Sequence, residues 1–210
     1  MNRLFSVVII GLPLRLFGFT KVIGRENLPK KGGFIIASNH QHDSDPFFLA
    51  VYMWQYEFRY YAKHTLWEIP FIGWLVGGVL SGAGQIPMNR VNTLEASKSL
   101  ARGSVALKEK KVIGIFPEGT KSRDGKLHKG HIGVSRTAFA AGASILPTAR
   151  VIVKGFWKRN EIHIGPMIEV SYVESPTKEQ YRALTDKVMT EIQKLSGQEY
   201  VDEYAAKRSK

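Results

Sequence analysis

Two residues of this chain, His40 and Asp45, have the types and the spacing of a general base and its orienting acid. The apolar run 34–37 just upstream is typical of a buried strand, so His40 should follow the strand and Asp45 should start the next helix. A histidine accepts a proton near neutral pH, and a carboxylate on its other ring nitrogen fixes the tautomer. We therefore expect the pair to activate a hydroxyl group at a strand-end loop, where α/β proteins place their ligands.

The same residues have a purely structural interpretation. Asp45 could cap a helix whose first residue is Pro46, which would leave His40 as an ordinary loop residue. His42 and Asp43 lie in the same loop and are alternative catalytic candidates. Sequence spacing alone does not choose among these possibilities.

A second polar turn follows the apolar run 112–116 and completes the sequence Phe-Pro-Glu-Gly-Thr-Lys-Ser over 116–122. Glycine allows the backbone to approach a ligand closely, and threonine, serine and lysine side chains can contact phosphate. The segment is not a P-loop, because Thr120 stands where that motif requires lysine and no aspartate partner for Mg²⁺ is evident. The turn is thus a candidate phosphate contact, although an ordinary polar turn is the more common structure for such a segment taken alone.

Two further segments of the chain carry basic residues that could contact phosphate. Arg90 ends the segment 84–90 and could bind phosphate through its guanidinium fork, although a lone arginine is usually a surface residue. The loop that follows the turn is basic and carries a single acid, Asp124; its basic residues are Lys121, Arg123, Lys126, His128, Lys129 and His131. The chain has neither a G-x-S-x-G nucleophile elbow nor an H-E-x-x-H zinc motif, so we expect no metal.

The composition limits the function classes. The chain has 210 residues and no cysteine, which excludes disulfides, thiolate metal sites and thiol catalysis. Its formal net charge of +12 favours an anionic partner such as a nucleic acid, an anionic membrane or a phosphorylated substrate. A non-catalytic lipid- or nucleic-acid-binding module is therefore an alternative of a different class. No nucleic-acid motif appears, however, and aromatic residues do not alternate with the basic run.

An apolar N-terminal segment favours a membrane among these anionic partners. Residues 4–19 are almost wholly apolar but contain Pro13 and Arg15, so the unbroken stretch is shorter than the ~20 residues of a spanning helix. No small-x-small site follows it, which argues against a signal peptide. We predict a helix that lies in the membrane interface, with its flanking basic residues at headgroup level; a core helix of a soluble domain is the alternative.

Strand-like apolar runs alternate with helical periodicity along the rest of the chain. This order predicts the α/β class: a single domain with a largely parallel mixed sheet flanked by helices, preceded by the N-terminal membrane-associated helical segment. The predicted strands are 33–38, 58–62, 85–88, 112–116, 145–153, 162–164 and 168–170, and the predicted helices are 46–55, 93–110, 132–142 and 178–195, the last behind a capping box at Thr177 and Gln180.

Together these segments resemble the glycerolipid acyltransferase family, which includes the 1-acylglycerol-3-phosphate acyltransferases. The family's motif N-H-x-x-x-x-D matches residues 39–45, and its motif F-P-E-G-T-R-S matches 116–122 except that Lys121 replaces arginine. The block 84–90 resembles the family's glycine-led second motif, with Pro-Met-Asn where aromatic-Ile-Asp is usual, and 145–147 resembles the proline-containing fourth motif. Order and spacing agree over about residues 20–175.

The resemblance implies that His40 is the general base and that Asp45 is its partner. His40 would take the proton from the free hydroxyl of 1-acyl-glycerol-3-phosphate, whose oxygen would attack an acyl thioester and give phosphatidic acid. The thioester is already activated, so the resemblance implies no cofactor and no metal. The implied substrate-binding residues are Arg90, Glu118, Gly119, Thr120 and Lys121, with Lys63 and Lys129 as further phosphate candidates.

The resemblance also implies the partners and the location. The partners are lysophosphatidic acid, acyl-CoA or acyl carrier protein, and the anionic lipids of a membrane surface, with no nucleic acid. We expect a membrane-associated protein at the cytoplasmic face, with a membrane-interface segment at 1–30, a catalytic domain at 31–210 and the apolar stretch 69–83 lining part of the acyl site. Lys121 and the altered second motif leave another lysolipid or an aminolipid open as the acceptor.

Overall fold

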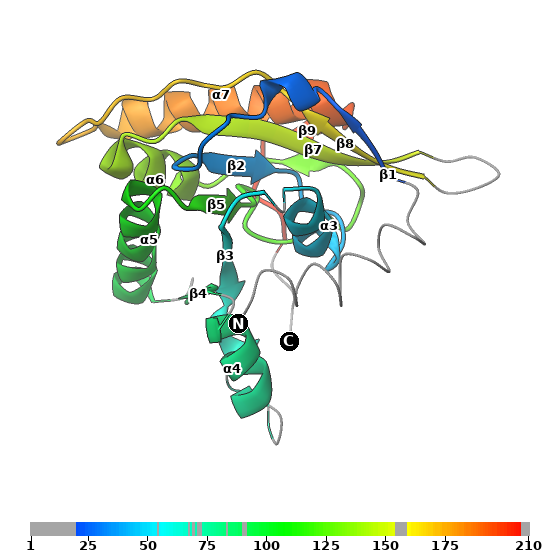
Figure 1. The fold of residues 1–210 in the computed structure, drawn as a ribbon. Coiled ribbons are helices and arrows are strands. Elements are labelled where there is room, and N and C mark those ends of the chain that lie inside the picture. Colours follow the sequence, from blue (N-terminus) through cyan, green and yellow to red (C-terminus); the bar gives the residue numbers. More distant parts are fainter. Residues whose placement is uncertain are drawn as a thin grey trace.

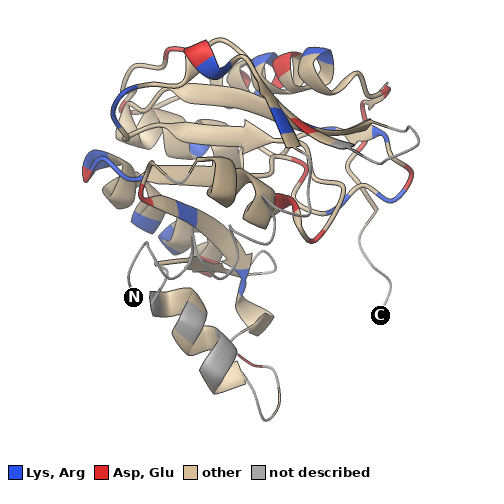
Figure 2. Cartoon of the chain, turned by 45° about the vertical axis from the view of Figure 1, so that its right-hand side comes forward, with Lys and Arg blue, Asp and Glu red and all other residues tan. Residues whose placement is uncertain are grey.

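The computed structural model describes residues 20–53, 55–66, 68, 70, 73–82, 84–89, 92–153 and 159–206. The predicted membrane segment 4–19 lies outside the described residues. Within the stretch 69–83, helix α4 (Gly73–Gly82) projects away from the sheet (Figures 1 and 2). Its sequence contains no charged residue. In the described part of the chain, no helix combines the length and the apolar character needed to cross a bilayer.

A seven-stranded sheet is the centre of the described structure, with the strand order β1-β8-β7-β2-β5-β3-β4 (Figure 1). All its neighbouring pairs are parallel except β7 with β8, which confirms the predicted largely parallel mixed sheet. The strands are β1 Thr20–Ile23, β2 Ile35–Ser38, β3 Phe58–Lys63, β4 Ile86–Met88, β5 Val112–Ile115, β7 Ile145–Val153 and β8 Arg159–Ile164, and a separate pair joins β6 Leu127–His128 to β9 Tyr200–Val201.

The central strands β2 and β5 are buried along their whole length, as expected for parallel strands covered by helices on both faces. Alternate residues enter different cores: Ile35 packs in the cluster of α6 and α7, whereas Ile36 packs in the cluster that contains Leu49 of α3. The helices are α3 Asp45–Tyr52 on one side and α5 Thr93–Lys108, α6 Gly133–Ala141 and α7 Lys178–Ser196 on the other (Figure 1).

Helix α7 begins as the sequence predicts. The Thr177 side chain accepts a hydrogen bond from the Gln180 N–H, and the Gln180 side chain accepts one from the Thr177 N–H. These reciprocal bonds satisfy two of the backbone donors that have no partner within the helix. The apolar face of the helix then buries Val188 and Ile192 against the sheet.

The structure differs from the sequence prediction at residues 168–170 and before residue 30. The strand expected at 168–170 is a single antiparallel bridge between Ile168 and Ile145. Strand β8 pairs with β7 from Thr148 onward, so only residues 145–147 of β7 remain open on that edge. The sheet also begins before the domain boundary predicted at residue 30, because β1 already pairs with β8. A four-residue edge strand that contains Thr20 and Lys21 gives only a weak sequence signal.

Candidate active site

His40 and Asp45 meet in the loop between β2 and α3. His40 Nδ1 lies 2.9 Å from Asp45 Oδ2, and their side chains are 17% and 1% exposed. The same carboxylate oxygen accepts the N–H groups of Gln41 at 2.7 Å and His42 at 2.8 Å. A proton on Nδ1 that is donated to Asp45 leaves Nε2 with its lone pair, which is the tautomer that a general base requires.

The geometry separates the alternatives for this loop. Asp45 is the first residue of α3, but its carboxylate turns back to the loop, and Ser44 at the N-cap makes no side-chain capping bond. Asp43 forms an exposed ion pair with Lys121, and His42 is exposed. The loop therefore brings His40 and Asp45 together and directs Asp43 elsewhere.

The Asp45 carboxylate is buried yet stays ionised. Burial raises the pKa of Asp45, but hydrogen bonds from His40, the His42 N–H and Arg150, together with the charge of Arg150, outweigh it and lower the pKa below its usual range. The ion pair is close, with Arg150 Nη1 at 2.6 Å from Asp45 Oδ1. Both oxygens of the carboxylate are thus engaged, one by the imidazole and one by the guanidinium.

The turn 116–122 lies against the histidine. The rings of His40 and Phe116 stack with centroids 4.2 Å apart and planes 21° apart, and Tyr60 lies parallel to Phe116 at 5.9 Å. The Ser122 N–H donates to the His40 carbonyl at 2.8 Å. The two segments meet because β2 and β5 are adjacent parallel strands, so the loops that follow them emerge at the same edge of the sheet.

Glu118 is buried beneath the two loops, with 1% of its surface exposed. Its carboxylate oxygens accept the His40 N–H at 2.9 Å and the His128 N–H at 3.2 Å. Burial raises the pKa of Glu118 to about 7, although both N–H groups and the charge of His128 oppose the shift. The side chain therefore connects backbone segments, and its predicted contact with the acceptor stays a prediction.

In the rest of the turn, the backbone is open to the close approach of a ligand. Gly119 has φ 76°, a left-handed conformation that favours glycine, and its N–H closes the turn onto the Phe116 carbonyl at 3.0 Å. Thr120 beside it is partly exposed. Lys121 Nζ reaches Asp43 Oδ2 at 2.5 Å, which places a cation at the loop that carries His40. A small cavity nearby is lined by Lys121, Arg123, Asp124, His128, Ala205 and Ala206.

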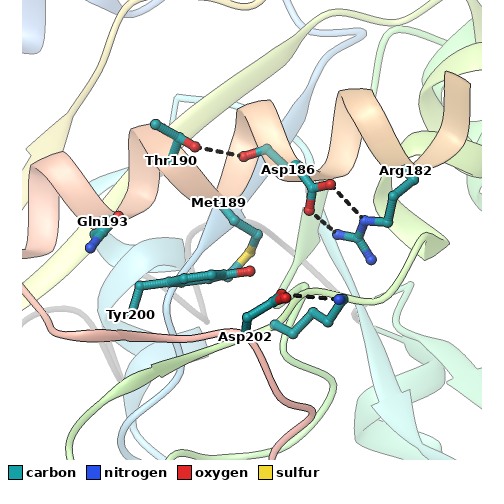
Figure 3. A pocket seen from close by; sticks show the side chains of 8 residues that line it. Arg182, Asp186, Met189, Thr190, Gln193, Tyr200 and Asp202 are labelled. Carbon is teal, nitrogen blue, oxygen red and sulfur yellow. Dashed lines mark hydrogen bonds and ion pairs between the residues drawn. The ribbon is translucent and has the colours of Figure 1, made fainter. Parts of the chain in front are cut away.

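The other phosphate candidates are more scattered. Lys63 is exposed at the end of β3, and Arg90 lies outside the described residues. Lys129 pairs with Asp202 at 3.0 Å and lines a pocket along α7 with Arg182 and Tyr200 (Figure 3). None of the residues that line this pocket belongs to the segments 39–45 or 116–122. The pocket of Lys129 is therefore separate from the His40–Asp45 pair.

Sequence reasoning missed a polar network behind the pair. Arg150 on β7 donates through Nε and Nη2 to Asn160 Oδ1, at 3.1 and 2.7 Å. The Asn39 side chain accepts the Arg150 N–H at 2.9 Å and donates to the Arg150 carbonyl at 3.1 Å. The signal that could have found this network is a charged residue within an otherwise buried strand, because such a residue needs a partner.

Among the described residues, no group of three His, Cys, Asp or Glu side chains is placed to hold a metal ion.

A family model described as Acyltransferase matches residues 19–151 of the chain. The chain is 32% identical over 184 residues to the 1-acyl-sn-glycerol-3-phosphate acyltransferase of Borreliella burgdorferi, covering 83% of this chain and 72% of that protein. It is 28% identical over 186 residues to the protein of the same name from Bacillus subtilis, covering 87% and 90% of the two chains.

A solved structure has the same fold. The crystal structure of the 1-acyl-sn-glycerophosphate acyltransferase of Thermotoga maritima superposes with a TM-score of 0.65 at 24% identity, covering 92% of this chain and 77% of that one. The family match spans both strand-end loops of the site and most of β7. On these grounds the chain belongs to the acyltransferase family.

Proposed function

We propose that the protein transfers an acyl chain from an acyl thioester to the free hydroxyl of 1-acyl-sn-glycerol-3-phosphate and so forms phosphatidic acid. The observation that carries the proposal is the 2.9 Å contact between His40 and the buried Asp45, with the imidazole stacked on Phe116 of the adjacent turn. The names of the relatives from Borreliella burgdorferi and Bacillus subtilis support the acceptor.

His40 acts as the general base in this proposal. Its Nε2 takes the proton of the lysolipid hydroxyl while Asp45 accepts the Nδ1–H and stabilises the imidazolium that forms. The hydroxyl oxygen attacks the thioester carbonyl and gives a tetrahedral oxyanion, which backbone N–H groups stabilise. The C–S bond then breaks, and the thiol leaves with the proton that His40 returns. The products are phosphatidic acid and a free thiol, and no oxidant or nucleotide is consumed.

The acceptor phosphate binds at the cationic side of the turn. Lys121 is the principal candidate, because its ammonium group lies within hydrogen-bond reach of the loop that carries His40. Gly119 and Thr120 complete the contact surface, and Arg90, Lys63 and Lys129 are the remaining candidates. We assign Glu118 to holding the two loops together, since both of its oxygens accept backbone N–H groups.

The site works at a membrane in this proposal, at its cytoplasmic face. Helix α4 supports the membrane surface as the place of action, because the helix is apolar and its Trp74 side chain is 78% exposed. An amphipathic tryptophan and a net charge of +12 both favour an anionic lipid interface. Either acyl-CoA or acyl carrier protein serves as the donor, and both are anionic.

The proposal is tested by following free thiol with purified protein, lysophosphatidate and each acyl donor in turn. Thiol release that requires lysophosphatidate, with phosphatidic acid as the lipid product, supports the proposal. A preference for another lysolipid or an aminolipid in an acceptor panel would keep the chemistry and replace the substrate. Binding to RNA or DNA that weakens with salt, with no thiol released from any donor, would overturn the proposal in favour of a binding module.

A further inference from the structure

We infer that Arg150 is a positioning residue of the His40–Asp45 pair, which fixes the Asp45 carboxylate in the orientation that binds the imidazole. The inference rests on the proposed function in that it needs the pair to be catalytic. Arg150 belongs to β7, two strands away from β5, and its side chain reaches Ser44 and Asp45 in the loop between β2 and α3.

The contact to Asp45 is direct and buried. Arg150 is 7% exposed, and its Nη1 donates to Asp45 Oδ1 at 2.6 Å and to Ser44 Oγ at 2.8 Å. Asp45 Oδ2 is left for His40 and for two backbone N–H groups. Because the guanidinium holds one oxygen, rotation of the carboxyl group would break bonds on both sides.

Two residues besides Ser44 and Asp45 hold the guanidinium in place. Asn160 accepts from Nε and Nη2, and the Phe48 ring lies under Cζ at 3.9 Å from its centroid. The Asn39 side chain bonds both backbone polar groups of Arg150, so the strand cannot slide beside β2. A planar guanidinium that is fixed in this way also fixes the orientation of the carboxylate that it binds. The flexible side chain of a lysine would not fix that orientation.

Arg150 is also the counter-charge of the buried Asp45 carboxylate. A buried carboxylate beside a neutral imidazole is unstable without a counter-charge. In the described structure, Arg150 supplies that charge, since the side-chain ion pairs of Asp45 are those with Arg150 and His40. In the described structure, Glu118 and Tyr60 also interact electrostatically with Asp45, and both are acids. Arg150 therefore keeps Asp45 ionised before His40 takes a proton.

The test compares Arg150→Met, Arg150→Lys and Asn160→Ala with the wild type in the thiol-release assay. We expect Arg150→Met to lower kcat about 10- to 100-fold, the range for residues that orient a catalytic group through another side chain, with little change in KM. The acidic limb of the pH profile should move to higher pH, because loss of the cation makes the pair hold a proton more tightly. In Arg150→Lys, the acidic limb should return to its wild-type pH because the charge is kept, but kcat should stay below the wild-type value. Asn160→Ala should lower kcat less than Arg150→Met does.

A matched control separates positioning from general loss of stability. Thr185→Val removes a buried hydrogen bond between α7 and Ser135 on the opposite side of the sheet. It should lower the melting temperature and leave kcat and the pH profile of folded protein unchanged. Wild-type kcat and an unmoved pH profile in folded Arg150→Met or Asn160→Ala would overturn the inference and leave the proposed function standing.

A readout without turnover keeps the two proposals distinguishable. Proton NMR of the His40 Nδ1–H reports its hydrogen bond to Asp45 whether or not the protein acylates a lipid. We expect this resonance far downfield in the wild type and shifted upfield or lost to exchange in Arg150→Met. An unchanged resonance refutes the role of Arg150, whereas a shifted one in a protein that releases no thiol refutes only the proposed function.

Discussion

The backbone N–H of His40 donates to the buried carboxylate of Glu118 at 2.9 Å, so the proposed base is held from its main chain as well as from its ring. The ring side is fixed by Asp45 and by stacking on Phe116. Three contacts from two elements therefore determine where Nε2 points. Such over-determined placement is what a general base requires, because proton transfer depends on heavy-atom distance and direction.

Replacement of His40 by alanine should lower kcat by about 10²- to 10⁴-fold with folding intact, because no group remains to take the hydroxyl proton. His42→Ala is the matched control: it removes an exposed histidine from the same loop and retains the N–H that Asp45 binds. Steady-state kinetics and circular dichroism of both variants check the prediction. Comparable activity in the two variants would contradict the assignment of the base.

Glu118 predicts a distinct pH dependence of stability. Its pKa of about 7 in the folded protein lies above the ordinary value of 4.5, so the folded state binds the proton more tightly than the unfolded state. The stabilisation is fully present below the ordinary pKa and is lost as the pH rises toward 7. Relative to Glu118→Gln, the wild type should lose about 3 kcal/mol of unfolding free energy between about pH 4 and pH 8. Urea denaturation of both proteins across this range measures the difference, and parallel profiles would refute the prediction.

The contribution of Asp45 to stability changes with pH in the direction opposite to that of Glu118. Its pKa is lowered in the folded protein, so its contribution to stability is present above its ordinary value of 3.8 and disappears as the pH falls through the folded pKa. At neutral pH, Asp45→Asn should destabilise the protein by about 3 kcal/mol, because Arg150 is left buried without a counter-charge. Denaturation at neutral and strongly acidic pH should show the deficit shrinking in acid. A deficit of equal size at both pH values would argue against the ion pair as its cause.

Lys121 should matter for binding and not for stability. Its ion pair with Asp43 is exposed, at 42% and 86%, and such pairs contribute no more than about 1 kcal/mol. Lys121→Ala should raise the KM for lysophosphatidate about tenfold and leave the KM for the acyl donor unchanged, the effect expected for loss of one phosphate contact. Asp43→Ala, which removes the partner but keeps the cation, is the control and should not raise the acceptor KM. An equal rise in both variants would show that the ion pair acts by holding the loop.

The sequence by itself determined the order of the central elements and the pair at their ends. Continuous apolar runs at β2 and β5 predict buried parallel strands, and the capping box at Thr177 predicts the start of α7. These signals are local, since they depend on hydrophobic runs and on hydrogen bonds within a few residues. Local signals did not predict β1 or the reduction of the strand expected at 168–170 to a single bridge at Ile168, because both depend on which sheet edge is open.

Only the tertiary structure decided which side chains join the pair. Arg150 is 105 residues from Asp45 in the chain, and Glu118 is 78 residues from His40, yet both are in hydrogen-bond contact. Sequence spacing does not encode such contacts, because the parallel sheet brings the ends of β2, β5 and β7 side by side only after long crossover connections. The folded sheet thereby turns a histidine and an aspartate five residues apart into a buried, charge-balanced site.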